Sequence, residues 1–403
     1  MQLGWIDFSK TERKSILNVL DLLSQKGTLD ELGIASVRDG FSNRFFPGTS
    51  TIQTRAKYFF IVPYALKELE LGSEINPNSV LKNLDEIERK CGEVFLAQNR
   101  NENGIIGKIS LLSGHWVKRA PSDIYWSGLR RYGIFTGGNI SLTEYVRAFC
   151  VMKKQKTTLQ NLGNRNDNAE EGERDDKDAG NLFKMQFWKM PLYDEHWFDN
   201  LAMQLTEAEG IFLKEQIIFT CPDTMLSYIL KNDMVEVLDC GRFRDLDGLM
   251  HKFPEYMQAD YRLALAFSDF MYVIRTLYNI MISDGKNIYA NEEFERLKEE
   301  MIKRADIDID HILLKLGVVR TDLKNFLKQV QDCMRNMDID GMKKYIKIRE
   351  ILLKGTNRAK TAHPGEFNPD EWMGGGELDY RFSNAKNILR DIFESEGKVD
   401  AKS

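Results

Sequence analysis

Apolar residues recur every three or four positions along most of this chain, and that spacing places them on one face of an α-helix. The clearest examples lie in the C-terminal half: Leu323, Phe326, Leu327, Val330 and Met334, and then Ala385, Ile388, Leu389 and Ile392. The alternation of apolar and polar residues that marks a half-buried strand is scarce, and only residues 104–112 could give one or two strands. The pattern predicts a mainly α, multi-helical fold with few short strands.

Helix starts carry a matching chemical signal. A Ser or Thr followed three residues later by Glu forms a capping box, in which the two side chains bond the free amides of the first helical turn. This pattern occurs three times: Ser9 with Glu12, Ser141 with Glu144, and Thr206 with Glu209. We therefore expect a helix to begin at each of these positions.

The longest apolar stretch, residues 263–282, has about the length of one bilayer crossing. It contains Asp269, Arg275 and Asn279, which are costly in hydrocarbon, so a buried core helix is expected and no membrane contact. Asp269 and Arg275 are six positions apart and do not stack on one helical face, so each needs a partner from another segment if it is buried.

Composition and termini favour a cytoplasmic protein. The five cysteines are scattered without a CxxC pair, which suggests neither a disulfide framework nor a zinc site. Residues 1–7 lack the basic-then-apolar build of a signal peptide. The net charge of −5 excludes a nucleic-acid footprint over the whole chain, so any such site must be a local basic patch.

Residues 154–181 are polar and acidic and cannot bury enough apolar surface to offset the entropy of ordering. We expect a disordered linker here, with a charge-driven interaction tail as the alternative. The linker would separate an N-terminal helical domain, 1–153, from a helical domain, 182–354. A Gly/Pro-rich segment with a C-terminal helix, 355–403, would pack back on the core.

The segment 38–60 is the richest in candidate binding residues. Pro47-Gly48 predicts a turn, and the Thr and Ser residues at 49–51 could cap the next helix, whose amides would then seat a phosphate. Basic and aromatic neighbours could bind phosphate and stack on bases. These candidates are Arg44, Arg55, Lys57 and Tyr58, with Phe45, Phe46, Phe59 and Phe60 as further stacking faces. The alternative is a structural helix with core aromatics and with Arg55 paired to an acid such as Asp39.

A second candidate lies at residues 118–134. Pro121-Ser122 starts a short helix and Gly133 ends it, with basic pairs at either end. These pairs, Lys118 with Arg119 and Arg130 with Arg131, suit a helix set against a phosphate backbone, and a helix-turn-helix-like unit is one context for such a helix. An ordinary amphipathic helix with arginines on its solvated face fits the same pattern.

The third candidate is residues 363–382, where a Gly-rich run precedes Asp379 and Arg381. A ligand site is one interpretation, and a turn locked to the core by charge-assisted bonds is the other. The segment lacks the GxxxxGK[ST] phosphate loop.

Nothing in the residues requires catalysis. The five histidines never stand at i,i+4 spacing, HExxH, GxSxG and GxGxxG are absent, and neither a metal nor a cofactor is expected. The only candidate catalytic groups are the carboxylates Asp39, Asp123 and Asp379, each near an arginine or lysine.

Four blocks resemble a bacterial family of about this length that is known only as a domain of unknown function: LGWIDFS at 3–9, FPGTSTIQTRAKYF at 46–59, PSDIYWSGL at 121–129 and GELDYRF at 376–382. The resemblance spans most of the chain apart from the polar insert and carries over no catalytic residues. It implies membership in mobile gene clusters that also encode helicase-type DNA translocases and phospholipase-D-like nucleases, a setting of anti-phage defence.

Two functions are therefore expected. The first is an accessory, non-catalytic subunit of a multi-protein bacterial anti-phage defence system that binds partner proteins such as the translocase and the nuclease, with DNA as a further candidate ligand. The alternative is a nucleic-acid-processing enzyme, a nuclease or base-removing enzyme with an Asp/Arg site.

Overall fold

The computed structural model describes residues 30–163, 187–191, 193–373 and 376–400. Across these ranges the chain is mainly helical, with no named strand and one isolated β-bridge between Phe135 and Trp188. The prediction of a mainly α, multi-helical fold is confirmed. The predicted strands at 104–112 are wrong, because Gly104 and Gly107 adopt left-handed φ angles of 84° and 75° that interrupt an extended chain. The segment forms turns and the short helix α5 (Lys108–Leu112).

Two compact units divide the chain, each built from segments distant in sequence: residues 1–42 with 250–380, and residues 43–249 with 381–403. We call them the 250–380 unit and the 43–249 unit. The expected consecutive blocks 1–153, 182–354 and 355–403 are a different division of the chain. Two helices, α2 (Ala35–Phe45) and the 3-10 helix η2 (Phe243–Lys252), run across the boundaries.

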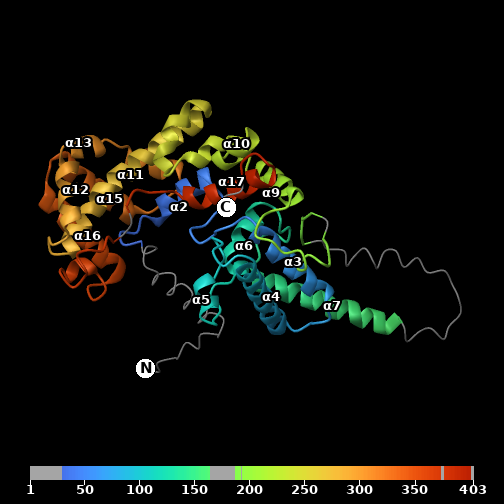
Figure 1. Cartoon of the computed structure of the whole chain (residues 1–403). Coiled ribbons are helices and arrows are strands. Elements are labelled where there is room, and N and C mark those ends of the chain that lie inside the picture. Colours follow the sequence, from blue (N-terminus) through green and yellow to red (C-terminus); the bar gives the residue numbers. More distant parts are fainter. Residues whose placement is uncertain (1–29, 164–186, 192, 374–375, 401–403) are drawn as a thin grey trace, which may run out of the picture. The chain divides into compact units, whose positions relative to one another are not determined.

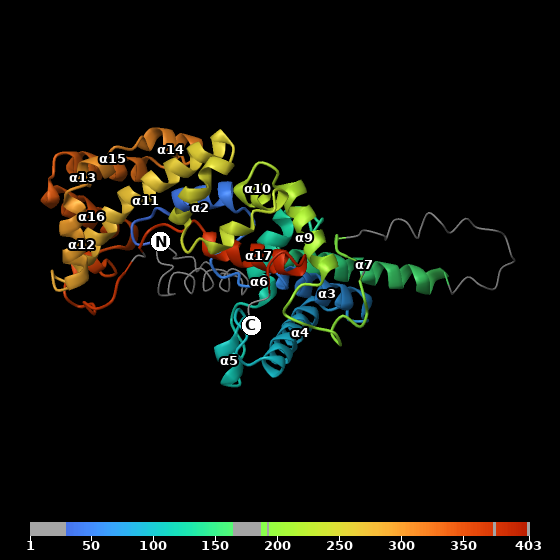
Figure 2. The same ribbon diagram turned by 45° about the horizontal axis from the view of Figure 1, so that its top comes forward.

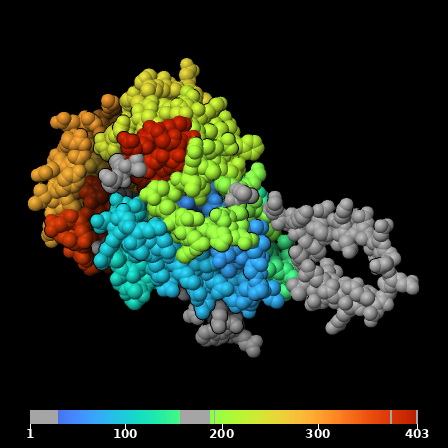
Figure 3. All heavy atoms as spheres, turned by 45° about the vertical axis from the view of Figure 1, so that its right-hand side comes forward, coloured from blue at the N-terminus to red at the C-terminus, as the bar shows by residue number. Residues whose placement is uncertain are grey.

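The 43–249 unit contains most of the N-terminal helices: α3 (Tyr58–Leu71), α4 (Pro77–Gln98), α5, α6 (Pro121–Arg131), α7 (Leu142–Gly163), α9 (Glu207–Thr220), α10 (Met225–Lys231), η1 (Val235–Asp239) and the C-terminal α17 (Phe382–Ser395). Helix α3 packs against α4 and α6, while α17 packs against α9 and η1 (Figure 1). The space-filling view shows α17 in red, flanked by the yellow-green residues that precede position 250 (Figure 3).

The 250–380 unit is organised around α11 (Glu255–Ile282), which contacts α12 (Ile288–Lys298), α13 (Met301–Arg304), α16 (Ile339–Lys354) and η3 (Lys360–Ala362). Helices α14 (Ile309–Lys315) and α15 (Thr321–Arg335) complete the layer beside α13 and α16 (Figure 2).

The expected core helix at 263–282 is confirmed within α11. Phe267, Phe270 and Ile274 are at most 1% exposed. The two charged residues find partners from other segments, as expected: Asp269 accepts from Arg304 at 3.1 Å, and Arg275 donates to the carbonyl of Gly376 at 2.8 Å. Within the described ranges, no helix combines the length and the hydrophobicity that a membrane crossing needs.

Two of the three capping boxes are confirmed. Ser141 and Glu144 exchange bonds of 2.6 and 3.2 Å, and Thr206 and Glu209 exchange bonds of 2.8 and 3.2 Å. The box at Ser9 lies outside the described residues. Helix α7 continues to Gly163, past the expected start of the polar linker at 154, because lysine and glutamine are good helix formers. The rest of that segment, from 164 on, lies outside the described residues.

Candidate functional site

The predicted helix cap at 49–51 is wrong, because the next helix begins only at Tyr58. The Thr49 hydroxyl instead donates to the carbonyl of Phe46 at 2.6 Å, and the Ser50 amide donates to Gln53 at 3.1 Å. Residues 49–57 therefore form a run of turns that leads into α3.

Arg55, the leading phosphate-binding candidate, is held in the interior of the 43–249 unit. Its Nε donates to both carboxylate oxygens of Asp391, at 2.9 and 3.1 Å, and its Nη1 pairs with Glu102. The Arg55 side chain is 14% exposed and that of Asp391 is 3% exposed. The predicted core pairing with an acid is found, but the acid is on α17 and is not Asp39.

The amides around Arg55 are also bonded within the protein. The hydroxyl of Tyr125, on α6, accepts from the amides of Thr54 and Arg55 at 2.9 and 3.1 Å and donates to the carbonyl of Arg55 at 2.7 Å. The amide of Ala56 donates to Asp391 at 2.6 Å. Protein groups thus fill the positions that a phosphate would need.

Lys57 and Tyr58 are buried as well. The ammonium of Lys57 donates to both oxygens of Glu209 at 2.9 and 2.7 Å, and the Tyr58 hydroxyl accepts from the amide of Ile106 at 2.9 Å. The aromatic candidates Phe45, Phe46, Phe59 and Phe60 are at most 2% exposed. The structure therefore assigns this motif to the core, and its rings offer no surface on which bases could stack.

Two acids of this unit have strongly perturbed protonation. Burial raises the pKa of Asp391 to about 6, although Arg55 and the Ala56 amide oppose the shift. Burial likewise raises the pKa of Glu88, which accepts from the amide and the hydroxyl of Ser122 at 2.7 and 3.1 Å. Perturbed acids often mark active sites, but structural networks perturb them too. Both carboxylates are enclosed by protein donors, which favours the structural explanation.

The basic residues around α6 lie nearer the surface. Lys118 and Arg131 are exposed, while Arg119 and Arg130 are half-buried. Arg130 donates to the side chain of Asn139 at 3.1 Å. The two pairs stand at opposite ends of α6, which spans roughly 16 Å at 1.5 Å per residue. Lys118 and Arg131 are therefore among the predicted binding residues that are exposed to solvent.

Arg44 and Arg381 also belong to the 43–249 unit. Arg44 is exposed in the last turn of α2. Arg381 has a left-handed φ of 67° just before α17 and donates to Asn43 and to the carbonyl of Thr49, at 3.1 and 2.9 Å. These bonds fix the turn before α17, as the structural alternative proposed.

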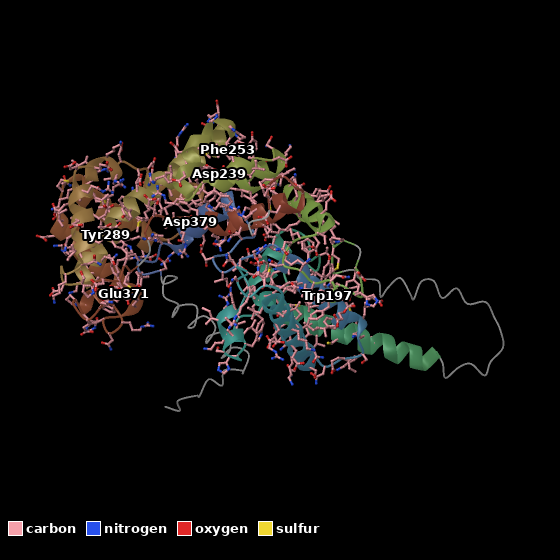
Figure 4. The ribbon with its side chains drawn as sticks, in the orientation of Figure 1. Trp197, Asp239, Phe253, Tyr289, Glu371 and Asp379 are labelled. Carbon is pink, nitrogen blue, oxygen red and sulfur yellow. The ribbon has the colours of Figure 1, made fainter. Side chains whose placement is uncertain are left out.

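The three candidate catalytic carboxylates are not gathered in one unit. Asp39 and Asp379 belong to the 250–380 unit, and Figure 4 labels Asp379. Asp123 lies exposed in the first turn of α6. Asp39 accepts from the neighbouring Arg38 at 3.3 Å. Among the residues that the structure describes, no group of three or more His, Cys, Asp or Glu side chains could hold a metal ion.

An open pocket in the 250–380 unit takes one wall from the third candidate segment, residues 363–382. Its volume is about 380 Å³, and α12 and the segment before position 373 line it. The lining residues are Asn287, Ile288, Tyr289, Glu292, Pro369, Asp370 and Trp372. Figure 4 marks Tyr289 and Glu371 in this part of the unit. The sequence prediction singled out Asp379 and Arg381 of that segment, neither of which lines the pocket, and it did not include α12.

The geometry defines a multi-helical protein whose most distinctive charged motif is part of its core. Residues 1–148 match the model of a family of unknown function, DUF6361, and this match confirms the resemblance to a domain of unknown function over the first three sequence blocks. No curated protein and no solved structure matches the chain.

Proposed function

We propose that the chain is a non-catalytic, cytoplasmic subunit of a multi-protein bacterial anti-phage defence system and that it acts by binding partner proteins. The family resemblance supplies the biological setting, with a helicase-type translocase and a phospholipase-D-like nuclease as the expected partners. The structural support is an apolar face on α16.

This α16 face consists of Tyr345, Ile348 and Leu352. Ile348 and Leu352 are one helical turn apart and are 50% and 68% exposed. The opposite side of α16, with Met342 and Ile346 fully buried, packs against α15 and α11. Single exposed apolar residues are common, but two on one face beside a half-buried tyrosine form a patch of the kind found at protein interfaces.

The test is co-purification of the tagged chain with the products of its neighbouring genes. Ile348→Lys with Leu352→Lys should remove the co-purifying partner and leave the melting temperature unchanged. Leu314→Lys with Val319→Lys is the matched control, because these residues are 82% and 95% exposed elsewhere in the same unit. A partner that survives the α16 double variant contradicts this surface, and so does a lower melting temperature of the variant chain alone.

DNA contact is a separate part of the proposal and rests on the basic residues around α6. Lys118→Ala and Arg131→Ala should each lower the slope of log K against log salt by about 1 if each side chain neutralises a phosphate. Lys82→Ala is the control, since that lysine is 78% exposed on α4 of the same unit. Undetectable DNA binding by the chain and its complex at low salt would remove this part.

A further inference from the structure

The pocket lined by Tyr289 and Trp372 has an aromatic wall whose position is fixed by the surrounding unit. The ring of Trp372 lies 5.4 Å from the ring of Tyr289, edge to face, and 6.2 Å from the ring of Tyr272, nearly parallel to it. Tyr289 is 60% exposed, so part of this aromatic surface faces solvent.

Hydrogen bonds from two buried asparagines fix the backbone beside Trp372. Asn279, which is fully buried on α11, accepts from the amide of Met373 at 2.7 Å and donates to its carbonyl at 2.9 Å. Asn287 donates to the carbonyl of Glu371 at 3.5 Å. The indole is therefore held in place before any ligand arrives, and this lowers the entropic cost of binding.

The charged residues that line the pocket are all acidic. Glu292 and Asp370 are both exposed and both line the pocket, and no lysine, arginine or histidine does. Glu293, one residue further along α12, is already bonded to Arg296 at 2.9 and 2.5 Å. Aromatic faces with nearby carboxylates attract a cation and repel phosphate.

We propose that this pocket binds the protonated side chain of an arginine or lysine presented by a protein partner. A cation seated against Trp372 and Tyr289 is attracted by the ring quadrupoles, and the two carboxylates add charge complementarity. The pocket is open to solvent, which suits a side chain that arrives on a protein surface better than a small molecule enclosed on most sides. This inference does not depend on the defence assignment or on the α16 face.

The test uses the full chain labelled with 5-fluorotryptophan, whose 19F spectrum should give one resonance for each of the six tryptophans. Trp372→Phe assigns the relevant signal. The probe is the peptide acetyl-Gly-Arg-Gly-amide, and the same peptide with citrulline is its neutral isostere. We expect the Trp372 resonance to move with the arginine peptide, with a dissociation constant on the order of 1–10 mM, and to stay in place with citrulline.

Variants then separate the pocket from general surface charge. Glu292→Gln with Asp370→Asn should weaken binding at least fivefold. Glu295→Gln with Glu299→Gln should leave binding unchanged, because Glu295 on α12 and Glu299 just after it are exposed but lie outside the pocket. Equal shifts with arginine and citrulline peptides would overturn the proposal, as would no shift up to about 50 mM. Saturation by spermidine without any response to arginine or lysine peptides would replace the protein partner with a free polyamine.

Discussion

Replacing Arg55 by methionine tests whether this residue is a structural ion-pair partner or a ligand-binding residue. The substitution keeps a flexible side chain of similar length but removes the ion-pair partner of Asp391, which is only 3% exposed and would still accept from the Ala56 amide. Removing one member of a buried pair costs about 3–5 kcal/mol, because the other charge stays buried. For a unit of this size, that corresponds to a drop in melting temperature of roughly 6–20 °C.

The loss should also depend on pH. The pKa of Asp391 is raised to about 6 by burial, and Arg55 restrains that shift. Since the folded pKa exceeds the unfolded value of about 3.9, the folded state binds this proton more tightly, and the group costs stability as pH rises through the folded pKa. Without Arg55 the folded pKa rises further. The loss of stability in Arg55→Met should therefore be larger at pH 8 than at pH 5, where Asp391 can be neutral.

Differential scanning calorimetry at the two pH values measures both effects. Arg131→Met is the control, because Arg131 is exposed on α6 and its loss should change stability by no more than about 0.5 kcal/mol. An Arg55→Met protein that melts within about 1 °C of the parent chain would refute the structural role. Normal melting together with lost DNA binding would restore the phosphate-binding interpretation.

Three further predictions concern stability. First, Arg349 and then Arg320 lower the pKa of Asp322 to about 2, so its contribution is present above the unfolded pKa and is lost as the pH falls from about 4 toward 2; Asp322→Asn should flatten the pH dependence of the melting temperature in that window. Second, Glu350→Ala should cost at least about 3 kcal/mol in a urea unfolding titration, because the buried carboxylate accepts from Tyr278 at 2.8 Å, among other donors. Third, Gly48→Ala should lower the free energy of unfolding by about 2 kcal/mol or more in the same titration. The φ of Gly48 is 79°, and a Cβ atom there would lie 2.6 Å from a ring carbon of Tyr132.

Local rules predicted the elements well. The capping box at Thr206 needs only residues within one turn, and the core helix around 263–282 needs only its own apolar pattern, so both can be read from the sequence. The strand expected at 104–112 failed because two glycines with left-handed φ decide the conformation there, and alternation alone does not reveal φ.

Local rules could not predict whether the charged motif around Arg55 lies in the core or at a binding surface. Arg55 and Asp391 are 336 positions apart, and no local rule distinguishes Asp391 from the other acids of the chain as the partner. An arginine close to a lysine and several aromatics has the composition of a phosphate site, and only the tertiary fold shows that each charge is matched in the interior. The pocket at Trp372 was predicted only in part for the same reason. Residues 363–382 were a candidate ligand site, but the other wall comes from α12, and no local rule brings the two segments together.

These long-range pairs make a prediction about the region that matches DUF6361. Residues 1–148 include Arg55 and Lys57, but the buried carboxylates that neutralise them, Asp391 and Glu209, lie beyond that match. An isolated fragment 1–148 would keep Glu102 beside Arg55, but it would lose Asp391, which also accepts from the Ala56 amide, and Glu209, which neutralises Lys57. The fragment would have to bury these groups without those partners or expose the apolar side chains around them, and either choice costs several kcal/mol against a typical stability of about 5–15 kcal/mol.

The fragment should therefore show no cooperative thermal transition by circular dichroism, whereas the full chain should show one. Co-expression of 1–148 with the remaining residues as a second chain should restore the transition, because it returns both carboxylates. Cooperative melting of the isolated fragment near the temperature of the full chain would mean that the matched region forms its own core, and that the pairs to Asp391 and Glu209 contribute little to it.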